Sequence, residues 1–158
     1  MIKYIVMDVD GTLTDGKIYM SPSGEAMKAF NIKDGYGIHN ILPVKSITPV
    51  IITGRSSSIV TNRCIELGID IVYQGVSDKV GKLMEITDAL DTVAYIGDDS
   101  NDSPCMKAVK AAGGVVGCPA DATSEIKSIA DYVAAHNGGE GAVRDFIEWL
   151  VELNGSNS

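Results

Sequence analysis

The sequence is poor in residues that carry disulfide, thiolate or histidine chemistry. Its three cysteines, Cys64, Cys105 and Cys118, share no CxxC spacing, and its two histidines, His39 and His136, lie far apart. We therefore expect neither a disulfide framework nor a zinc site, and the expected compartment is a reducing cytoplasm. No motif places a histidine beside a serine or cysteine, so a serine or cysteine hydrolase is not expected either.

Positive charge and long apolar runs are also scarce. Thirteen Lys and Arg against 21 Asp and Glu give a formal net charge of −8. This balance argues against nucleic acid or an anionic membrane as the main partner. The chain reaches Asp8 and Asp10 before any apolar segment is long enough for a signal peptide or a membrane span.

Isoleucine and valine dominate the apolar residues, with 33 together against 7 leucines. That excess favours buried β-strands over a leucine-packed helical bundle. Short apolar segments alternate with segments of helical length, which indicates a parallel sheet with helices on both faces. We expect strands at 2–9, 48–53, 70–73, 92–96 and 114–116, and helices at 35–42, 56–67, 77–90, 102–112 and 141–153. The prediction is a Rossmann-like three-layer α/β sandwich formed by one domain, residues 1–153, with a polar tail at 154–158.

Residues 16–30 interrupt this alternation. Two short runs surround Ser-Pro-Ser-Gly, a sequence typical of a β-hairpin turn. The segment is too short for a separate cap domain, so we expect a hairpin flap. Its apolar side chains would be exposed in a monomer and favour a contact with another subunit; they are Ile18, Tyr19, Met20, Met27 and Phe30.

Polar residues follow four of the predicted strands. Asp8 and Asp10 follow the first strand, Thr-Gly-Arg at 53–55 the second, a loop ending in Lys79 the third, and Gly-Asp-Asp-Ser-Asn-Asp at 97–102 the fourth. The carboxyl ends of parallel strands meet at one edge of a sheet, where ligand crevices usually form. The four segments together therefore predict one site.

The acidic residues of this crevice require a counter-charge. Asp8 and Asp10 are two residues apart at a strand end and can project to the same side. Asp98, Asp99 and Asp102 would arrive from a neighbouring strand end. So many carboxylates cannot all stay ionised without a cation. Mg²⁺ takes oxygen ligands and suits a site that also holds phosphate, so we expect a magnesium site.

The other residues at these strand ends suit an anion. Lys79 supplies a positive charge and Thr53 a hydroxyl donor, while Gly11 and Gly54 let backbone N–H groups approach closely. Carboxylates, a cation and anion-binding groups at one edge fit phosphoryl transfer better than redox or acyl chemistry.

These motifs resemble those of the haloacid dehalogenase superfamily. The resemblance rests on DVDGTLTDG at 8–16, ITGR at 52–55, Lys79 and GDDSND at 97–102. The short length, the hairpin, FNIKDGYGI at 30–38 and NGGEGAVRDF at 137–146 narrow it to the capless phosphatases that act on 3-deoxy-D-manno-octulosonate 8-phosphate. Relatives of that group act on the 9-phosphates of nine-carbon keto-sugar acids (KDN or N-acetylneuraminate).

The resemblance implies a role for each catalytic residue. Asp8 would be the nucleophile that forms an aspartyl-phosphate. Asp10 would protonate the leaving sugar oxygen and then deprotonate the attacking water. The Asp8 carboxylate, the Asp10 backbone carbonyl and Asp98 would hold Mg²⁺. Thr53 and Lys79 would bind the phosphoryl oxygens.

Further roles are implied for residues around this centre. Asp99 and Asp102 would orient the groups that hold the metal. Asn101 would approach the substrate. Asn31 and Asp34, in the segment 30–38, are expected among the substrate contacts.

The substrate of this group is anionic, so cations near the crevice are candidates for binding it. We expect Gly54 and Arg55 to contact the substrate, with Arg55 on its carboxylate. Arg63 has two interpretations: a substrate contact, or an ion pair with Glu66 at helical i,i+3 spacing. Relatives that act on the nine-carbon acid can carry an acidic residue at the position of Arg55, which favours the eight-carbon substrate here and leaves the nine-carbon phosphate as the alternative.

The crevice of a capless monomer would be open to water. We therefore expect the hairpin of one subunit, with the Gly-rich segment 138–141, to cover the crevice of a neighbour, and the resemblance implies a homotetramer.

Other protein classes fit the sequence less well. A phospho-accepting receiver module has its acidic pair first, with the Thr and Lys after the phosphorylated Asp, whereas here GDDSND follows Lys79. A nucleotide-binding domain would need GxGxxG or GxxxxGK[ST], and neither occurs. An inactive homologue is not expected because Asp8, Asp10, Lys79 and Asp98 are all intact.

Overall fold

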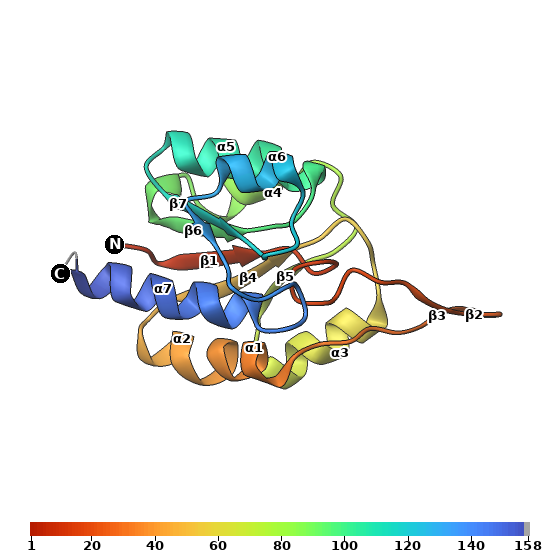
Figure 1. The fold of residues 1–158 in the computed structure, drawn as a ribbon. Helices are drawn as coiled ribbons and strands as arrows, with labels where there is room; N and C mark the ends of the chain where they lie inside the picture. The colour runs from red at the N-terminus through yellow and green to blue at the C-terminus, as the bar shows by residue number, and fades with distance from the viewer. Residues whose placement is uncertain (157–158) are drawn as a thin grey trace.

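A computed structural model describes residues 1–156, and its centre is a parallel β-sheet (Figure 1). Its six strands lie in the order β5-β4-β1-β6-β7-β8, and every neighbouring pair is parallel. The strands are β1 (Tyr4–Met7), β4 (Thr48–Ile52), β5 (Ile71–Tyr73), β6 (Val93–Ile96), β7 (Val115–Cys118) and β8 (Tyr132–Val133). The predicted α/β sandwich with a parallel sheet is confirmed.

Helices cover both faces of the sheet (Figure 1). One face carries α1 (Ile32–Tyr36), the π-helical turn η1 (Gly37–Ile41), α2 (Leu42–Val44), α3 (Ser58–Leu67) and α7 (Ala142–Ser156). The other face carries α4 (Lys79–Ile86), α5 (Ser103–Ala111) and α6 (Ser124–Ile129). Two short 3-10 turns, η2 (Leu90–Thr92) and η3 (Ser100–Asp102), flank β6.

The strands divide the core into two clusters because neighbouring side chains point to opposite faces. In β1, Ile5 and Met7 pack into the cluster under α7, whereas Val6 packs into the cluster under α5, and all three are fully buried. The register aligns Met7 with Ile51 of β4 and Ile96 of β6. The residues that follow these three strands therefore emerge together at the carboxyl edge.

Residues 16–30, which interrupt the alternation of strands and helices, form the predicted hairpin. Strands β2 (Tyr19–Ser21) and β3 (Gly24–Met27) pair antiparallel and project away from the sheet (Figure 1). No helix in residues 1–156 has the length and apolar character that crossing a membrane requires.

The structure also departs from the predicted elements. Helix α6 and strand β8 were not predicted, because the segment 119–141 has neither helical nor strand periodicity. The helix expected at 35–42 is part of a helical stretch that begins at Ile32 and ends at Val44. Helix α7 continues to Ser156, into the predicted polar tail, and Asn154 exchanges hydrogen bonds with the backbone of Ile2. Residues 157–158 of that tail lie outside the described residues.

Candidate active site

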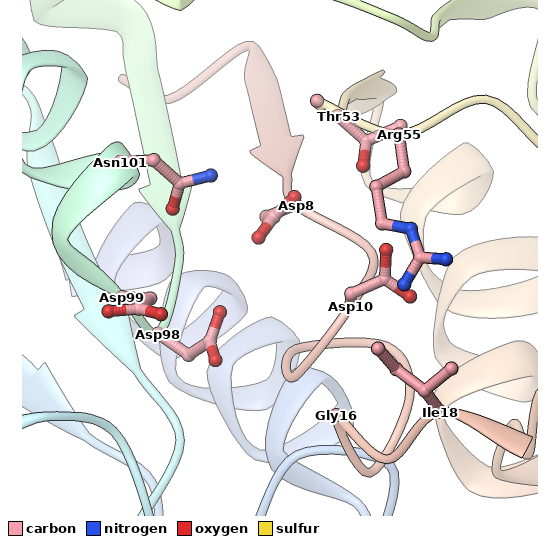
Figure 2. A pocket seen from close by; sticks show the side chains of 10 residues that line it. Asp8, Asp10, Gly16, Ile18, Thr53, Arg55, Asp98, Asp99 and Asn101 are labelled. Carbon is pink, nitrogen blue, oxygen red and sulfur yellow. The ribbon is translucent and has the colours of Figure 1, made fainter.

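A polar pocket of about 260 Å³ opens at the carboxyl edge of the sheet (Figure 2). Asp8, Thr53 and Asp98 reach it from the ends of β1, β4 and β6. Figure 2 shows Asp10 and Arg55 on one side of Asp8, and Asp98, Asp99 and Asn101 on the other. The lining residues are Asp8, Asp10, Gly16, Ile18, Thr53, Gly54, Arg55, Asp98, Asp99 and Asn101. The structure thus brings together three of the four predicted segments around one space.

Three carboxylates converge at the base of this pocket. Asp8, Asp98 and Asp102 each offer an oxygen, and these atoms lie within 4.8 Å of one another. Burial and the charge of Asp102 raise the pKa of Asp8 to about 6, against the opposing effect of Lys79. Burial and the charges of Asp8, Asp102 and Asp99 raise the pKa of Asp98 to about 8. Burial is the largest cause of both shifts, and the neighbouring carboxylates add to it, so a bound cation would favour the ionised forms of Asp8 and Asp98.

Gly11 allows Asp98 to approach the loop after β1. Its φ of +85° lies in the left-handed region, and a Cβ at this position would overlap the Asp98 carboxylate. The Thr12 hydroxyl donates to Asp98 Oδ1 over 3.4 Å. A glycine at position 11 is therefore needed both for the turn and for the position of Asp98.

Lys79 is buried behind Asp8. Its ammonium Nζ lies 3.2 Å from Asp8 Oδ1 and 3.0 Å from Asp102 Oδ1. Burial alone would lower the pKa of Lys79, but the two carboxylates outweigh it and the pKa is raised. Lys79 therefore stays charged and partly neutralises Asp8. Lys79 is not among the residues that line the pocket, so its contact with a phosphoryl oxygen stays a prediction.

Asp102 is fully buried and holds its neighbours in place. Besides the Lys79 ammonium, its Oδ1 accepts the Tyr95 hydroxyl at 2.7 Å, and its Oδ2 accepts the backbone N–H of Asp98 at 3.0 Å. Asp99 is exposed and caps η3 through the N–H of Ser100. Asp102 also lies close enough to be counted with the metal-site carboxylates, and the orienting roles expected of Asp99 and Asp102 stay predictions.

The mouth of the pocket carries the predicted substrate residues Gly54, Arg55 and Asn101. The Arg55 side chain is half exposed, and its guanidinium lies 3.9 Å from Glu25 of the hairpin. The Thr53 side chain faces the same space but is almost fully buried. A half-exposed guanidinium at a pocket mouth remains available to an anionic ligand.

The Asp10 carboxylate is bound by Lys28, a residue of the hairpin segment. Lys28 Nζ donates to Asp10 Oδ1 at 2.6 Å and to Glu25 Oε2 at 3.0 Å. The Asp10 side chain therefore faces away from the group formed by Asp8, Asp98 and Asp102, and only its backbone carbonyl remains for the expected metal contact.

Three predicted substrate residues lie elsewhere in the chain. Asn31, Asp34 and Arg63 line a small separate cavity against Phe30 and Leu67. The Asn31 side chain caps α1, and Asp34 Oδ1 accepts the N–H of Arg144 at the start of α7. Neither residue lines the pocket that contains Asp8, and the expectation that Asn31 and Asp34 contact the substrate stays a prediction.

Arg63 follows its second interpretation in this chain. Its guanidinium pairs with Glu66 and lies 5.6 Å from the centre of the Phe30 ring. It does not reach the pocket that contains Asp8.

The Gly-rich segment 138–141 makes contacts within its own chain. A Cβ on Gly138 would overlap the carbonyl of Gly11, and the N–H of Gly139 donates to the carbonyl of Thr12 at 3.2 Å. Gly138 is buried against the loop after β1 of its own chain. Within one chain, Gly138 and Gly139 thus pack against their own loop after β1, and cover of a neighbouring crevice by this segment stays a prediction.

Several contributors to the site were missed in the sequence. Lys28 lies 18 residues from Asp10, and only the folding back of the hairpin joins them. Ile18 and Gly16 line the pocket from the base of the hairpin. In the sequence, Tyr95 is an ordinary strand residue. Its hydroxyl meets Asp102 because the turn after β6 brings Asp102 back toward the strand. The one available signal was the oppositely charged pair Glu25 and Lys28, three residues apart in the hairpin segment.

Comparisons with known proteins agree with this geometry. No family model matches the chain. It is 42% identical over 158 residues to the 3-deoxy-D-manno-octulosonate 8-phosphate phosphatase KdsC of Escherichia coli K12, covering 98% of this chain and 81% of that protein.

Solved structures give the same result. The cobalt-bound phosphatase YrbI of Haemophilus influenzae matches with a TM-score of 0.87 and 35% identity, covering 98% of this chain and 90% of that one. The Moraxella catarrhalis phosphatase, in complex with magnesium, phosphate and KDO, matches with a TM-score of 0.85 and 39% identity, over 96% and 86% of the two chains. With a carboxylate cluster at the expected strand ends, the chain belongs to the KdsC family of phosphatases in the haloacid dehalogenase superfamily, and it is a phosphoric monoester hydrolase.

Proposed function

We propose that this chain is a Mg²⁺-dependent phosphatase that releases phosphate from 3-deoxy-D-manno-octulosonate 8-phosphate through an aspartyl-phosphate. The observation that carries the proposal is the placement of Asp8 between Lys79 and the carboxylates of Asp98 and Asp102, at the base of a pocket open to a small ligand. The names of its relatives supply the substrate.

In the first step, an Asp8 carboxylate oxygen attacks the phosphorus atom and the bond from phosphorus to the sugar oxygen breaks. Asp10 lies two residues further on and lines the same pocket, where it gives a proton to the departing sugar oxygen. The Lys79 ammonium, 3.2 Å from Asp8, favours the ionised form of the nucleophile and partly compensates its charge.

In the second step, Asp10 takes a proton from water, and the water oxygen attacks the phosphorus atom of the aspartyl-phosphate. The acyl phosphate bond breaks, and Asp8 is regenerated as a carboxylate beside inorganic phosphate. The nearly buried Thr53 side chain and the loop at Gly54 face the same space and would contact the phosphoryl oxygens.

Asp8 and Asp98, with the Asp10 backbone carbonyl, would hold the metal ion. The fit is supported by the convergence of the Asp8 and Asp98 oxygens and by the raised pKa values of both, since burial and neighbouring carboxylates disfavour their charged forms and a cation would favour them. Bound Mg²⁺ would neutralise phosphoryl oxygens and let both carboxylates remain ionised together. Asp102, with four hydrogen-bond donors already on its two oxygens, would position Lys79 and the loop after β6.

Arg55 would bind the carboxylate of the keto-sugar acid at the mouth of the pocket, where Asn101 would approach the sugar. The nine-carbon keto acid 9-phosphates present the same carboxylate and phosphate, so they are the alternative substrates. Chain length would be distinguished by one or two contacts of about 1–3 kcal/mol each.

We also propose that the chain forms a homotetramer in which the hairpin of one subunit covers the crevice of a neighbour. The support is the exposure of Ile18, Met20 and Met27 on the hairpin beside the open pocket. The three buried free thiols suit the reducing cytoplasm that the sequence predicts.

A phosphate-release panel tests the proposed activity. We expect continuous turnover of the eight-carbon substrate with Mg²⁺, slower turnover of nine-carbon keto acid and hexose phosphates, and loss of activity with a chelator. Asp8→Asn is expected to lower kcat by at least about 10³-fold, since the nucleophile is lost, with the circular dichroism spectrum unchanged.

Three results would contradict the proposal. Wild-type turnover by Asp8→Asn would exclude its role as nucleophile, and activity unaffected by the chelator would exclude the metal. Stoichiometric trapping of phosphate without turnover would instead indicate a receiver-type module.

A further inference from the structure

Lys28, directly after strand β3 of the hairpin, contacts the Asp10 carboxylate at the site. Its side chain is only 2% exposed, while the Asp10 side chain that it contacts is 28% exposed and that of Glu25 is 15% exposed. Lysine is almost never this deeply buried unless its ammonium is paired. Here Nζ lies between two carboxylates that come from different segments, the loop after β1 and the hairpin.

Stability alone does not explain this arrangement. A buried ion pair carries a desolvation cost, and apolar side chains of similar volume often stabilise a fold as well or better. A methionine would fill the same volume at position 28, in a hairpin that already carries Met20 and Met27. A charged group at this position therefore points to a requirement of the site itself.

That requirement is the orientation of Asp10. Among residues 1–156, Lys28 is the side chain that holds the Asp10 carboxylate, and it does so through Oδ1. With Oδ1 bound to an ammonium, the proton that Asp10 transfers is directed to Oδ2. Glu25 takes a second N–H of the same ammonium, which fixes the direction in which Nζ points.

We infer that Lys28 is a positioning residue, which holds Oδ1 of Asp10 so that Oδ2 faces the leaving sugar oxygen, with Glu25 as its anchor in the hairpin. This inference rests on the proposed role of Asp10. The hairpin then contributes to the site, because Lys28, which orients the proton donor Asp10, directly follows strand β3 of the hairpin.

The test compares two leaving groups. A sugar oxygen needs a proton as it departs, whereas the phenolate of 4-nitrophenyl phosphate departs without one, so loss of Asp10 function affects kcat/KM for the sugar phosphate selectively. Lys28→Met is expected to lower kcat/KM for 3-deoxy-D-manno-octulosonate 8-phosphate by about tenfold or more, and that for 4-nitrophenyl phosphate by less than about threefold. Asp10→Asn should show the same selectivity with a larger loss.

Two further variants exclude a general loss of structure. Lys28→Arg keeps the positive charge and should retain a ratio of the two kcat/KM values within about threefold of wild type. Lys17→Met, at an exposed lysine of the same hairpin, should leave both values unchanged.

An equal loss on both substrates with Lys28→Met would overturn the inference in favour of a structural role, as would no loss on either. If Lys28→Met does not fold, a changed ratio in Lys28→Arg would overturn it. A wild-type enzyme that hydrolyses another alkyl phosphate but not the eight-carbon acid would refute the proposed substrate alone, and the same ratio would then be measured with that phosphate.

Discussion

Asp34 is a buried carboxyl whose ionisation works against the fold. It is 2% exposed, its Oδ1 accepts the backbone N–H of Arg144, and its Oδ2 is buried without a hydrogen-bond partner among the described residues. Burial raises its pKa from 3.8 to about 6, against the favourable backbone N–H and two arginines. At neutral pH the Asp34 carboxylate is therefore ionised in the folded protein, and the groups around it compensate its lost hydration only in part.

The sign of the resulting pH dependence follows from linkage. Because the folded pKa exceeds the unfolded one, the folded state binds more protons between about pH 4 and pH 6, so the contribution of Asp34 to stability falls as the pH rises through this window. Asp34→Asn keeps the acceptor for Arg144 and removes the charge. Relative to wild type, its free energy of unfolding should rise by about 1–3 kcal/mol between pH 4 and pH 7.5.

Urea denaturation of both proteins across this range measures the effect. Asp88→Asn, at an exposed position, is the matched control and should show no such trend. If the difference in the free energy of unfolding between wild type and Asp34→Asn stays constant with pH, the pKa of Asp34 is the same in the folded and unfolded states.

At the scale of elements, two loops distant in sequence pack against each other beside the candidate site. The loop after β1 (residues 10–15) turns at Gly11, and the segment before α7 (residues 137–141) lies directly against it. The N–H of Gly138 also donates to Asp121. The position of Asp10 therefore depends on a glycine segment near the C-terminal helix.

Gly138→Ala tests this dependence. A Cβ would overlap the Gly11 carbonyl and crowd that of Thr14, both of which are backbone and cannot move aside independently. We expect a loss of about 3 kcal/mol or more in the free energy of unfolding, and a lower kcat/KM in any protein that folds.

Gly155→Ala is the control, because nothing lies within 4 Å of a Cβ at that position. Equal stability of the two variants would contradict the close packing of the loops.

At the scale of the whole molecule, the exposed apolar residues have an uneven distribution. Met20 and Met27 on the projecting hairpin are 64% and 56% exposed, and Ile32 and Tyr36 on α1 follow it in the chain. Hairpins with both faces in water are marginally stable. Contact with another subunit would bury these side chains and restrict the access of water to the pocket.

Sedimentation velocity tests the proposed assembly. We expect the wild type to sediment as a tetramer at micromolar concentration, and Met20→Lys with Met27→Lys to shift the population toward monomers because each lysine would have to be desolvated at the interface. Activity should fall in parallel with dissociation. A wild-type monomer that is fully active would refute the assembly and the cover it provides.

The residues of the candidate site that follow the strands could be predicted, because each of them comes directly after a short apolar segment of the sequence. Asp8, Thr53 and Asp98 each follow a short apolar segment, and the parallel sheet aligns the ends of such segments at one edge. Segments 119–141 and 30–38 were harder, because neither has a clear period. Asp34 was expected among the substrate contacts, but its buried carboxylate accepts the N–H of Arg144, a residue 110 positions away.

The order of apolar and polar residues along this chain was thus enough to predict five of the six strands, the edge of the sheet where the candidate site lies and the acidic residues placed there. Only the tertiary structure decided which charges meet. Lys28 reaches Asp10 because the hairpin folds back, and Gly138 reaches Gly11 because the segment before α7 lies against the loop after β1. Periodicity reports whether a side chain is buried, whereas contacts between distant segments depend on how whole elements pack, which no local pattern encodes.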